Sequence, residues 1–187
     1  MKKKPELEEL ALGKVFTLIE QGPVLLVATK NGRRNNVMTI TWSTVLDFAG
    51  NFAIVTGSWN HSYEALVKNR ECVVAIPPAT MLETAVDIGM CSGADTDKFR
   101  RFVLTAIKSR EIKAPLIGEC LANIECRVTD IIEKHGIFVL SAVKAWTNPD
   151  ISDCRIAHAV GDGTFVIDGE HVNLRNRMAE KIPAGVS

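Results

Sequence analysis

The chain has 187 residues, with 22 Lys and Arg against 22 Asp and Glu and a formal net charge of zero. This length is enough for one domain with a hydrophobic core. The balanced charge argues against a general nucleic-acid or anionic-membrane partner, because both favour basic proteins. The opening MKKK precedes PELEEL rather than an apolar stretch, and no run approaches the roughly 18 apolar residues of a membrane span. We therefore expect a soluble, cytoplasmic protein.

The cysteines do not form a recognisable framework. Their number is odd, their spacing is wide and no CxxC pair occurs, which argues against disulfides and against a zinc site. Cys72 and Cys126 lie in apolar runs that favour buried thiols. Cys91 adjoins a loop of small and polar residues, where lining a site and simple packing are equally supported.

Hydrophobic periodicity predicts the elements of the first half in chain order. Residues 5–20 have the spacing of an amphipathic helix. Apolar or alternating runs predict strands over residues 22–30, 35–48, 51–57 and 71–78. A tight turn at Asn31-Gly32 joins the first two strands. A short helix over 62–70 should turn Tyr63, Leu66 and Val67 inward.

The second half adds helices and a long hairpin. Residues 80–90 and 95–102 look helical, and 113–119 look irregular. Two long strands over 120–136 and 137–146 meet at His135-Gly136, and a short strand over 163–169 follows. Six or seven strands joined mostly by hairpins predict a mainly β protein with short helices, built as an antiparallel barrel rather than from βαβ units. We expect one domain over residues 1–187, with the N-terminal helix at about 5–20. The tail at about 170–187 is expected to be loose or to contact a partner subunit.

Familiar catalytic motifs are absent from the sequence. It contains no GxGxxG, GxxxxGK[ST], HExxH or GxSxG, and its four histidines lack metal-ligand spacing. We therefore predict no metal site and name no catalytic residue. Redox or other demanding chemistry would have to come with an organic cofactor.

Three segments could hold such a cofactor. In GSWNHSYEAL, Ser58, His61 and Ser62 precede a predicted helix and suit a phosphate, although a simple helix cap at Asn60 or Ser62 is favoured when the segment is taken alone. NNVMTITWST is too polar for a fully buried strand and could face a planar heterocycle, although solvated threonines explain it equally simply. CSGADTDKF offers Gly93 for close backbone approach and Lys98 for an anion, although a solvated lysine is the default.

The order of these segments is more informative than any one of them. They resemble the flavin reductase-like family of FMN-binding split-barrel proteins, especially its flavoredoxin-type members. The resemblance covers roughly residues 22–143, and the matching segments are GPVLLVAT, NNVMTITWST, SWNHSYEAL, VVAIPP, GMCSGADTDKF, APLIGECLANIECRV and IFVLSAV. It implies a six-stranded Greek-key split barrel, a homodimer, and FMN bound near the subunit interface.

The resemblance also assigns cofactor-binding residues. The stretch lining the isoalloxazine and ribityl chain would comprise Asn36, Met38, Thr39, Thr41, Trp42 and Ser43. The phosphate turn would comprise Ser58, His61 and Ser62. The loop closing over the flavin would comprise Cys91, Ser92 and Gly93, followed by a helix with Asp97, Lys98 and Phe99. Many relatives have Arg or Lys where this chain has His61, whose charge depends on pH. The tail matches only loosely, so no function is carried over to His158.

The expected function is that of an FMN flavoprotein of flavoredoxin type, an oxidoreductase that carries electrons between protein partners. One alternative is an NAD(P)H-dependent flavin reductase, and another is a split-barrel protein that binds a ligand other than flavin. The sequence shows no obvious clamp for a nucleotide phosphate, which favours the carrier. One expected partner is a second copy of the chain. The other is a protein that donates or accepts electrons, or else NAD(P)H. We expect neither a nucleic-acid nor a membrane partner.

Overall fold

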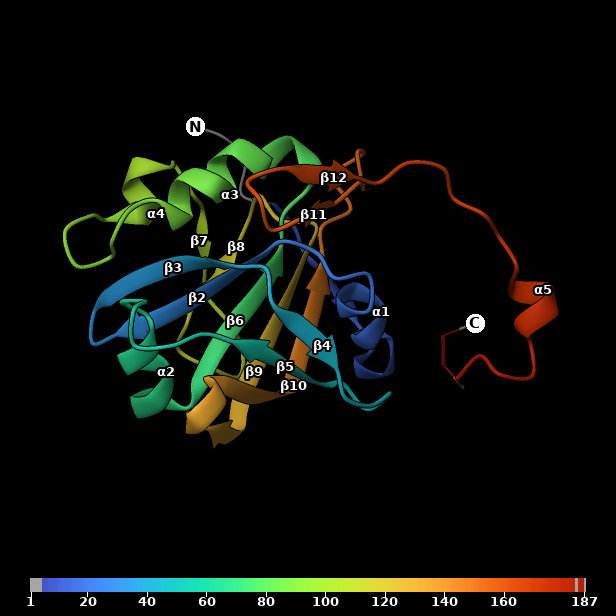
Figure 1. Ribbon diagram of the computed structural model, residues 1–187, viewed down its shortest axis with the longest axis horizontal. Helices are drawn as coiled ribbons and strands as arrows, with labels where there is room; N and C mark the ends of the chain where they lie inside the picture. Colours follow the sequence, from blue (N-terminus) through green and yellow to red (C-terminus); the bar gives the residue numbers. More distant parts are fainter. Residues whose placement is uncertain (1–4, 184, 187) are drawn as a thin grey trace.

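The computed structural model describes residues 5–183, 185 and 186. The opening MKKK therefore lies outside the described residues. The fold is mainly antiparallel β with a few short helices (Figure 1). The main sheet has the order β3-β2-β6-β9-β10-β5-β4, with β1 also paired to β10. Its strands are β1 (Glu8–Leu10), β2 (Leu25–Asn31), β3 (Arg34–Ile40), β4 (Ser43–Val45), β5 (Asn51–Val55), β6 (Glu71–Ile76), β9 (Ala122–Ile132) and β10 (Ile137–Thr147).

Short elements surround this sheet. Two small ribbons pair β7 (Ala106–Ile107) with β8 (Leu116–Ile117) and β11 (Ala157–Ala159) with β12 (Phe165–Ile167). The helices are η1 (Leu12–Lys14), α1 (Phe16–Ile19), α2 (Tyr63–Asn69), η2 (Ala79–Met81), α3 (Leu82–Gly89), α4 (Lys98–Arg101), η3 (Glu133–His135) and α5 (Arg175–Met178). No helix of the described residues is long and apolar enough to cross a membrane.

The sheet curls because one strand is shared between its two ends. β3 and β4 stand at opposite ends of the strand order, yet only Thr41 and Trp42 separate them along the chain. With β3 and β4 taken as one interrupted strand and the short β1 set aside, the main sheet of the described residues has six strands. The prediction of a mainly β, six-stranded antiparallel split barrel is confirmed, whereas the prediction of one continuous strand over 35–48 is wrong.

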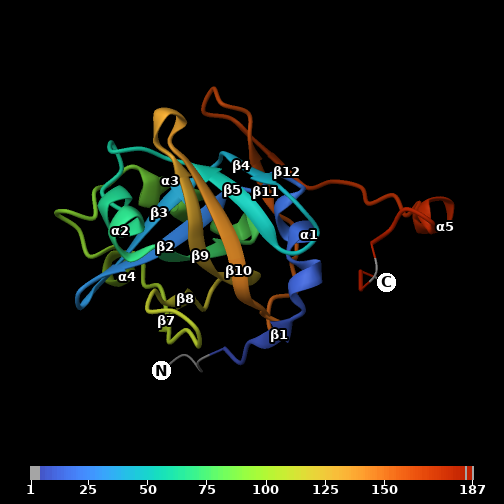
Figure 2. The ribbon, with the colours of Figure 1, turned by 90° about the horizontal axis from the view of Figure 1, so that it is seen from below.

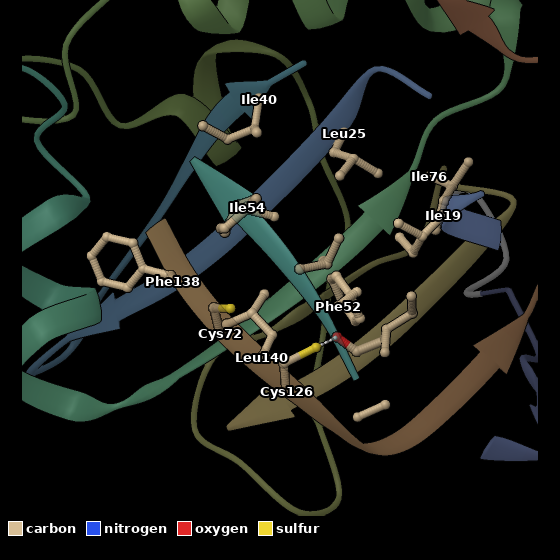
Figure 3. Close-up of a cluster of buried hydrophobic side chains, with 14 of the residues drawn as sticks. Ile19, Leu25, Ile40, Phe52, Ile54, Cys72, Ile76, Cys126, Phe138 and Leu140 are labelled. Atoms are coloured by element: carbon tan, nitrogen blue, oxygen red, sulfur yellow. Dashed lines mark hydrogen bonds between the residues drawn. The ribbon is translucent and has the colours of Figure 1, made fainter. Parts of the chain in front are cut away.

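Alternation of side chains builds two hydrophobic layers. β2 sends Leu25 and Val27 into the barrel interior and Leu26 to the opposite face. Figure 3 shows the interior cluster, in which Cys72 and Cys126 lie opposite each other on β6 and β9. Both thiols are fully buried, as predicted, and burial raises the pKa of Cys126. The outer layer packs beneath α3 and α4, and this packing positions both helices beside β3.

Two sequence predictions about helices are wrong. The N-terminal helix over 5–20 is replaced at its start by β1, in which Glu8 pairs with Thr147 of β10, and only residues 12–19 contain helical turns. Apolar spacing in so short a segment fits both states, and the free edge of β10 decides between them. Val67 of α2 is 38% exposed rather than inward-facing, because Leu66 takes the buried side.

The Val24 amide donates to the Ala157 carbonyl over 2.8 Å and joins the β11–β12 ribbon to the barrel, while polar contacts of Asp168 hold the ribbon itself together. Asp168 Oδ1 lies 2.8 Å from His158 Nε2, and Asp168 Oδ2 accepts a hydrogen bond from the Ile156 amide. Burial raises the pKa of Asp168, but these two hydrogen bonds and the nearby imidazoles of His158 and His171 together outweigh it, so the net pKa lies below its usual value. Beyond Asp168, the chain leaves the barrel as an arm that carries α5 (Figures 1 and 2).

Asp168→Asn should lower the free energy of unfolding by about 1 kcal/mol at neutral pH, because a charge-assisted contact is lost. The folded pKa of Asp168 is depressed, so its contribution is complete above the ordinary aspartate pKa of about 3.9 and disappears as pH falls further. Urea unfolding at pH 7 and pH 3 should therefore show a larger gap between the two proteins at pH 7 than at pH 3. An equal gap at both values would contradict this account.

Candidate functional site

The three segments singled out in the sequence meet at one pocket of about 290 Å³. β3 forms one wall, the turn before α2 forms a second, and the loop between α3 and α4 forms a third. Figure 2 shows these elements gathered on one side of the barrel. The lining residues are Asn36, Met38, Thr39, Trp59, Asn60, His61, Ser62, Gly89, Met90, Cys91, Ser92, Gly93 and Lys98.

The turn before α2 is joined to β3 by a buried hydrogen bond. Asn36 Nδ2 donates to Ser62 Oγ over 2.8 Å, and Ser62 is 1% exposed. Ser62 occupies the position before the first residue of α2 but makes no side-chain capping bond. Asn60 likewise directs its amide to Thr56 Oγ1. The side-chain cap favoured by the local sequence is therefore not formed, and the Ser62 hydroxyl proton is left available to the pocket.

Asn36 also has an oxygen without a partner. Its Oδ1 atom is buried and accepts no hydrogen bond from the described residues, and the whole residue is only 7% exposed. An unsatisfied buried polar atom costs on the order of 1–3 kcal/mol, so its presence at a pocket wall indicates a ligand group that can complete it. Gly93 lies directly against this amide, and a Cβ atom there would be 2.3 Å from Asn36 Oδ1.

Lys98 is the most unusual charge in the pocket. It is 4% exposed, and its Nζ donates to the Ile88 carbonyl over 2.8 Å. No carboxylate of the described residues forms an ion pair with it. Burial lowers the pKa of Lys98, while the neighbouring Cys91 opposes the shift. A buried ammonium without a counter-charge is costly, so this lysine favours an anionic occupant.

Cys91 lies at the pocket wall rather than in the core. It is partly exposed, and its thiol donates to the same Ile88 carbonyl that accepts from Lys98, with a sulfur–oxygen distance of 3.8 Å. The sequence left open whether Cys91 lines a site or only packs against its neighbours, and the structure places it in the lining of the pocket.

The structure brings together most of the residues singled out from the sequence. The predicted cofactor residues that line the pocket are Asn36, Met38, Thr39, His61, Ser62, Cys91, Ser92, Gly93 and Lys98. Thr41, Trp42, Ser43 and Ser58 lie outside its lining. Among these four, the buried Ser43 Oγ lacks a partner and Trp42 is 65% exposed. The hydroxyl of Thr39 is already used, because it donates to the Ala85 carbonyl and ties β3 to α3.

Four lining residues were missed. Trp59 and Asn60 lie within the quoted turn, where the sequence argument concentrated on hydroxyl and imidazole groups. Gly89 and Met90 end α3, and only their position next to Cys91 could have indicated them. Trp59 is 73% exposed and Met90 is 80% exposed, so both present apolar surface at the rim of the pocket.

The fold and the pocket define a split barrel with a site suited to an anionic ligand that also donates hydrogen bonds. Residues 20–156 match the family model described as Flavin reductase like domain. Because the match covers most of the chain, the protein belongs to this family.

Individual proteins resemble this chain in sequence or in fold. An uncharacterised protein of Archaeoglobus fulgidus is 35% identical over 107 residues. The match covers 56% of this chain and 60% of that protein, which is less than two thirds of the relative's length. An FMN-binding domain of a flavin reductases-like enzyme from Shewanella baltica has a TM-score of 0.83 at 21% identity, covering 91% of this chain and 98% of that one. The flavoredoxin of Desulfovibrio vulgaris (Miyazaki F) has a TM-score of 0.75 at 22% identity, covering 81% and 89%. At these identities the two structures support the fold.

Gly93→Ala should destabilise the protein by about 1–3 kcal/mol, because the new methyl group must displace the Asn36 side chain from its bond to Ser62. Gly89→Ala is the matched control, since its Cβ would meet Thr39 at an ordinary 3.4 Å. Chemical denaturation of both variants measures the difference. Equal stability of the two would show that the Gly93–Asn36 approach is not a constraint.

Proposed function

We propose that this chain is an FMN flavoprotein of flavoredoxin type, which accepts electrons from one protein and passes them to another. The single observation that carries the FMN assignment is the buried, uncompensated Lys98 beside the unpartnered Asn36 oxygen. FMN offers both complements, because its phosphate is an anion and its ribityl hydroxyls and ring N–H are donors. Membership of the flavin reductase-like family supports the same ligand.

The residues present fit this group. Lys98, Ser62 and His61 would provide donors to the phosphate or to the electron-rich edge of the flavin, and Asn36 would accept from it. When bound, FMN would supply the electron chemistry, and the chain would bind it, orient it and limit its contact with water. Homodimer formation is part of the proposal, supported by the exposed apolar side chains of Trp42, Leu46 and Phe48 around β4.

The carrier role is favoured over direct use of NAD(P)H by the rim of the pocket. Trp59 and Met90 present large apolar surface to solvent there, and such residues are enriched in protein interfaces. The second candidate, an NAD(P)H-dependent flavin reductase, is supported by the family itself. It would require an open flavin face against which a nicotinamide can stack.

The visible absorption spectrum of the purified protein tests the FMN assignment. A flavin spectrum, or its appearance after incubation with FMN followed by desalting, is expected. A colourless protein that fails to bind added FMN would exclude the proposed function and favour a different ligand.

With FMN bound, stopped-flow mixing with NADH and NADPH separates the carrier role from the reductase role. The flavin absorbance of a carrier should be bleached slowly by both nucleotides, whereas that of a reductase should be bleached rapidly by at least one.

Lys98→Met should weaken FMN binding by about 10- to 100-fold, because a charge-assisted hydrogen bond is worth about 1.5–3 kcal/mol. The same change should leave the ligand-free protein at least as stable, since an unpaired buried charge is removed. Fluorescence titration and urea unfolding measure the two effects, with Lys134→Met as the exposed control. A loss of stability together with unchanged affinity would assign Lys98 a purely structural role. Titration with riboflavin shows whether Lys98 acts on the phosphate, because riboflavin lacks it.

A further inference from the structure

A second cavity of about 650 Å³ lies next to the candidate flavin pocket. It is formed between the β2–β3 hairpin and α4, which lie side by side in both views (Figures 1 and 2) although they are far apart in the sequence. We call it the arginine cavity. Its hairpin side is lined by Arg33, Arg34 and Asn35, and its α4 side by Asp97, Phe99 and Arg100.

The arginine cavity is positively charged in a chain whose net charge is zero. Within the part of the chain that the structure describes, Arg33, Arg34 and Arg100 form no ion pair. Asp97 is the acidic residue among the lining side chains, and its carboxylate accepts the backbone N–H of Arg100. The guanidinium groups of Arg33 and Arg100, and the remaining N–H donors of Arg34, are therefore available to an anionic partner.

The arginine cavity is also coupled by contact to the candidate flavin pocket. Arg34 Nη1 donates to the Ala94 carbonyl over 3.2 Å, and Ala94 belongs to the loop that forms one wall of that pocket. Along β3, Asn35 lines the arginine cavity while Asn36 lines the pocket. A partner bound at the arginines would therefore contact the segments that enclose the flavin.

Exposed apolar side chains near both cavities favour a protein partner over a nucleotide. Val103, just after α4, is 77% exposed and has a φ of +54°, a backbone conformation that is costly for a β-branched residue. Trp59 and Met90 are exposed at the rim of the neighbouring pocket. Arg, Trp and Met are enriched in the centres of protein interfaces, and a nucleotide within the arginine cavity would leave these apolar groups uncovered.

We infer that the arginine cavity, with Val103, Met90 and Trp59, is the docking surface for the acidic face of a one-electron carrier protein. The inference rests on the proposed FMN function and names the chemistry of its electron donor. Two reduced carriers in turn would each supply one electron, and with two protons from solvent these electrons would reduce bound FMN to FMNH₂, leaving both carriers oxidised. Electrostatic attraction would accelerate the encounter at low ionic strength.

Stopped-flow reduction of the FMN-loaded protein tests this surface, with a reduced, acidic [2Fe–2S] ferredoxin as the probe. Arg33→Glu combined with Arg100→Glu reverses two charges whose side chains make no hydrogen bond among the described residues, so folding should be preserved. The second-order rate constant should fall roughly tenfold or more at low salt, and the salt dependence seen in the unaltered protein should be lost. Lys134→Glu, on η3, is the matched control and should change neither. Reduction by dithionite should be the same in all three proteins.

Three outcomes would overturn the inference. The first is an unchanged rate in the charge-reversed protein, and the second is no reduction of the unaltered protein by the ferredoxin. The third is a selective loss of reduction by NADPH relative to NADH in the charge-reversed protein, which would make the arginine cavity a nucleotide-phosphate site. Failure of the FMN assignment is seen separately, because the flavin absorbance would then be missing before mixing.

Discussion

The break between β3 and β4 is the constraint on which the rest of the structure depends. Because Thr41 and Trp42 carry one strand path from one end of the sheet to the other, the sheet must curl. Curling encloses Met38 and Ile40 in the interior and leaves β3 in contact with α3 and α4. The position of Asn36 follows from this geometry.

The candidate pocket contains buried polar groups that lower the stability of the protein when no ligand is bound. Among the described residues, Lys98 is buried without a counter-charge and Asn36 has a buried oxygen without a hydrogen-bond donor. Each cost would be offset by an anionic ligand that also donates hydrogen bonds. The requirement is chemical, so it holds independently of any likeness to other proteins.

The two cavities give different kinds of evidence about function. The buried groups of the candidate flavin pocket indicate which ligand the protein binds. The exposed arginines of the arginine cavity and the apolar side chains near it indicate which partner docks on the protein. In the linear sequence Arg33 and Arg34 are separated from Arg100 by the helices α2, η2 and α3 and by several strands. The sequence therefore shows no arginine cluster, and only the folded chain brings the three side chains to one cavity.

The sequence by itself determined the long strands, their hairpins and the three segments of the site, because alternation, Asn-Gly turns and runs of small polar residues are local signals. It could not determine β1, whose residues fit a helix equally well until the edge of β10 is available. Nor could it show that Ser62 bonds to Asn36 instead of capping α2, that Trp59 and Met90 reach the pocket, or that Lys98 lacks a counter-charge. These features arise from contacts between residues far apart in the chain, and only the tertiary structure decides such contacts.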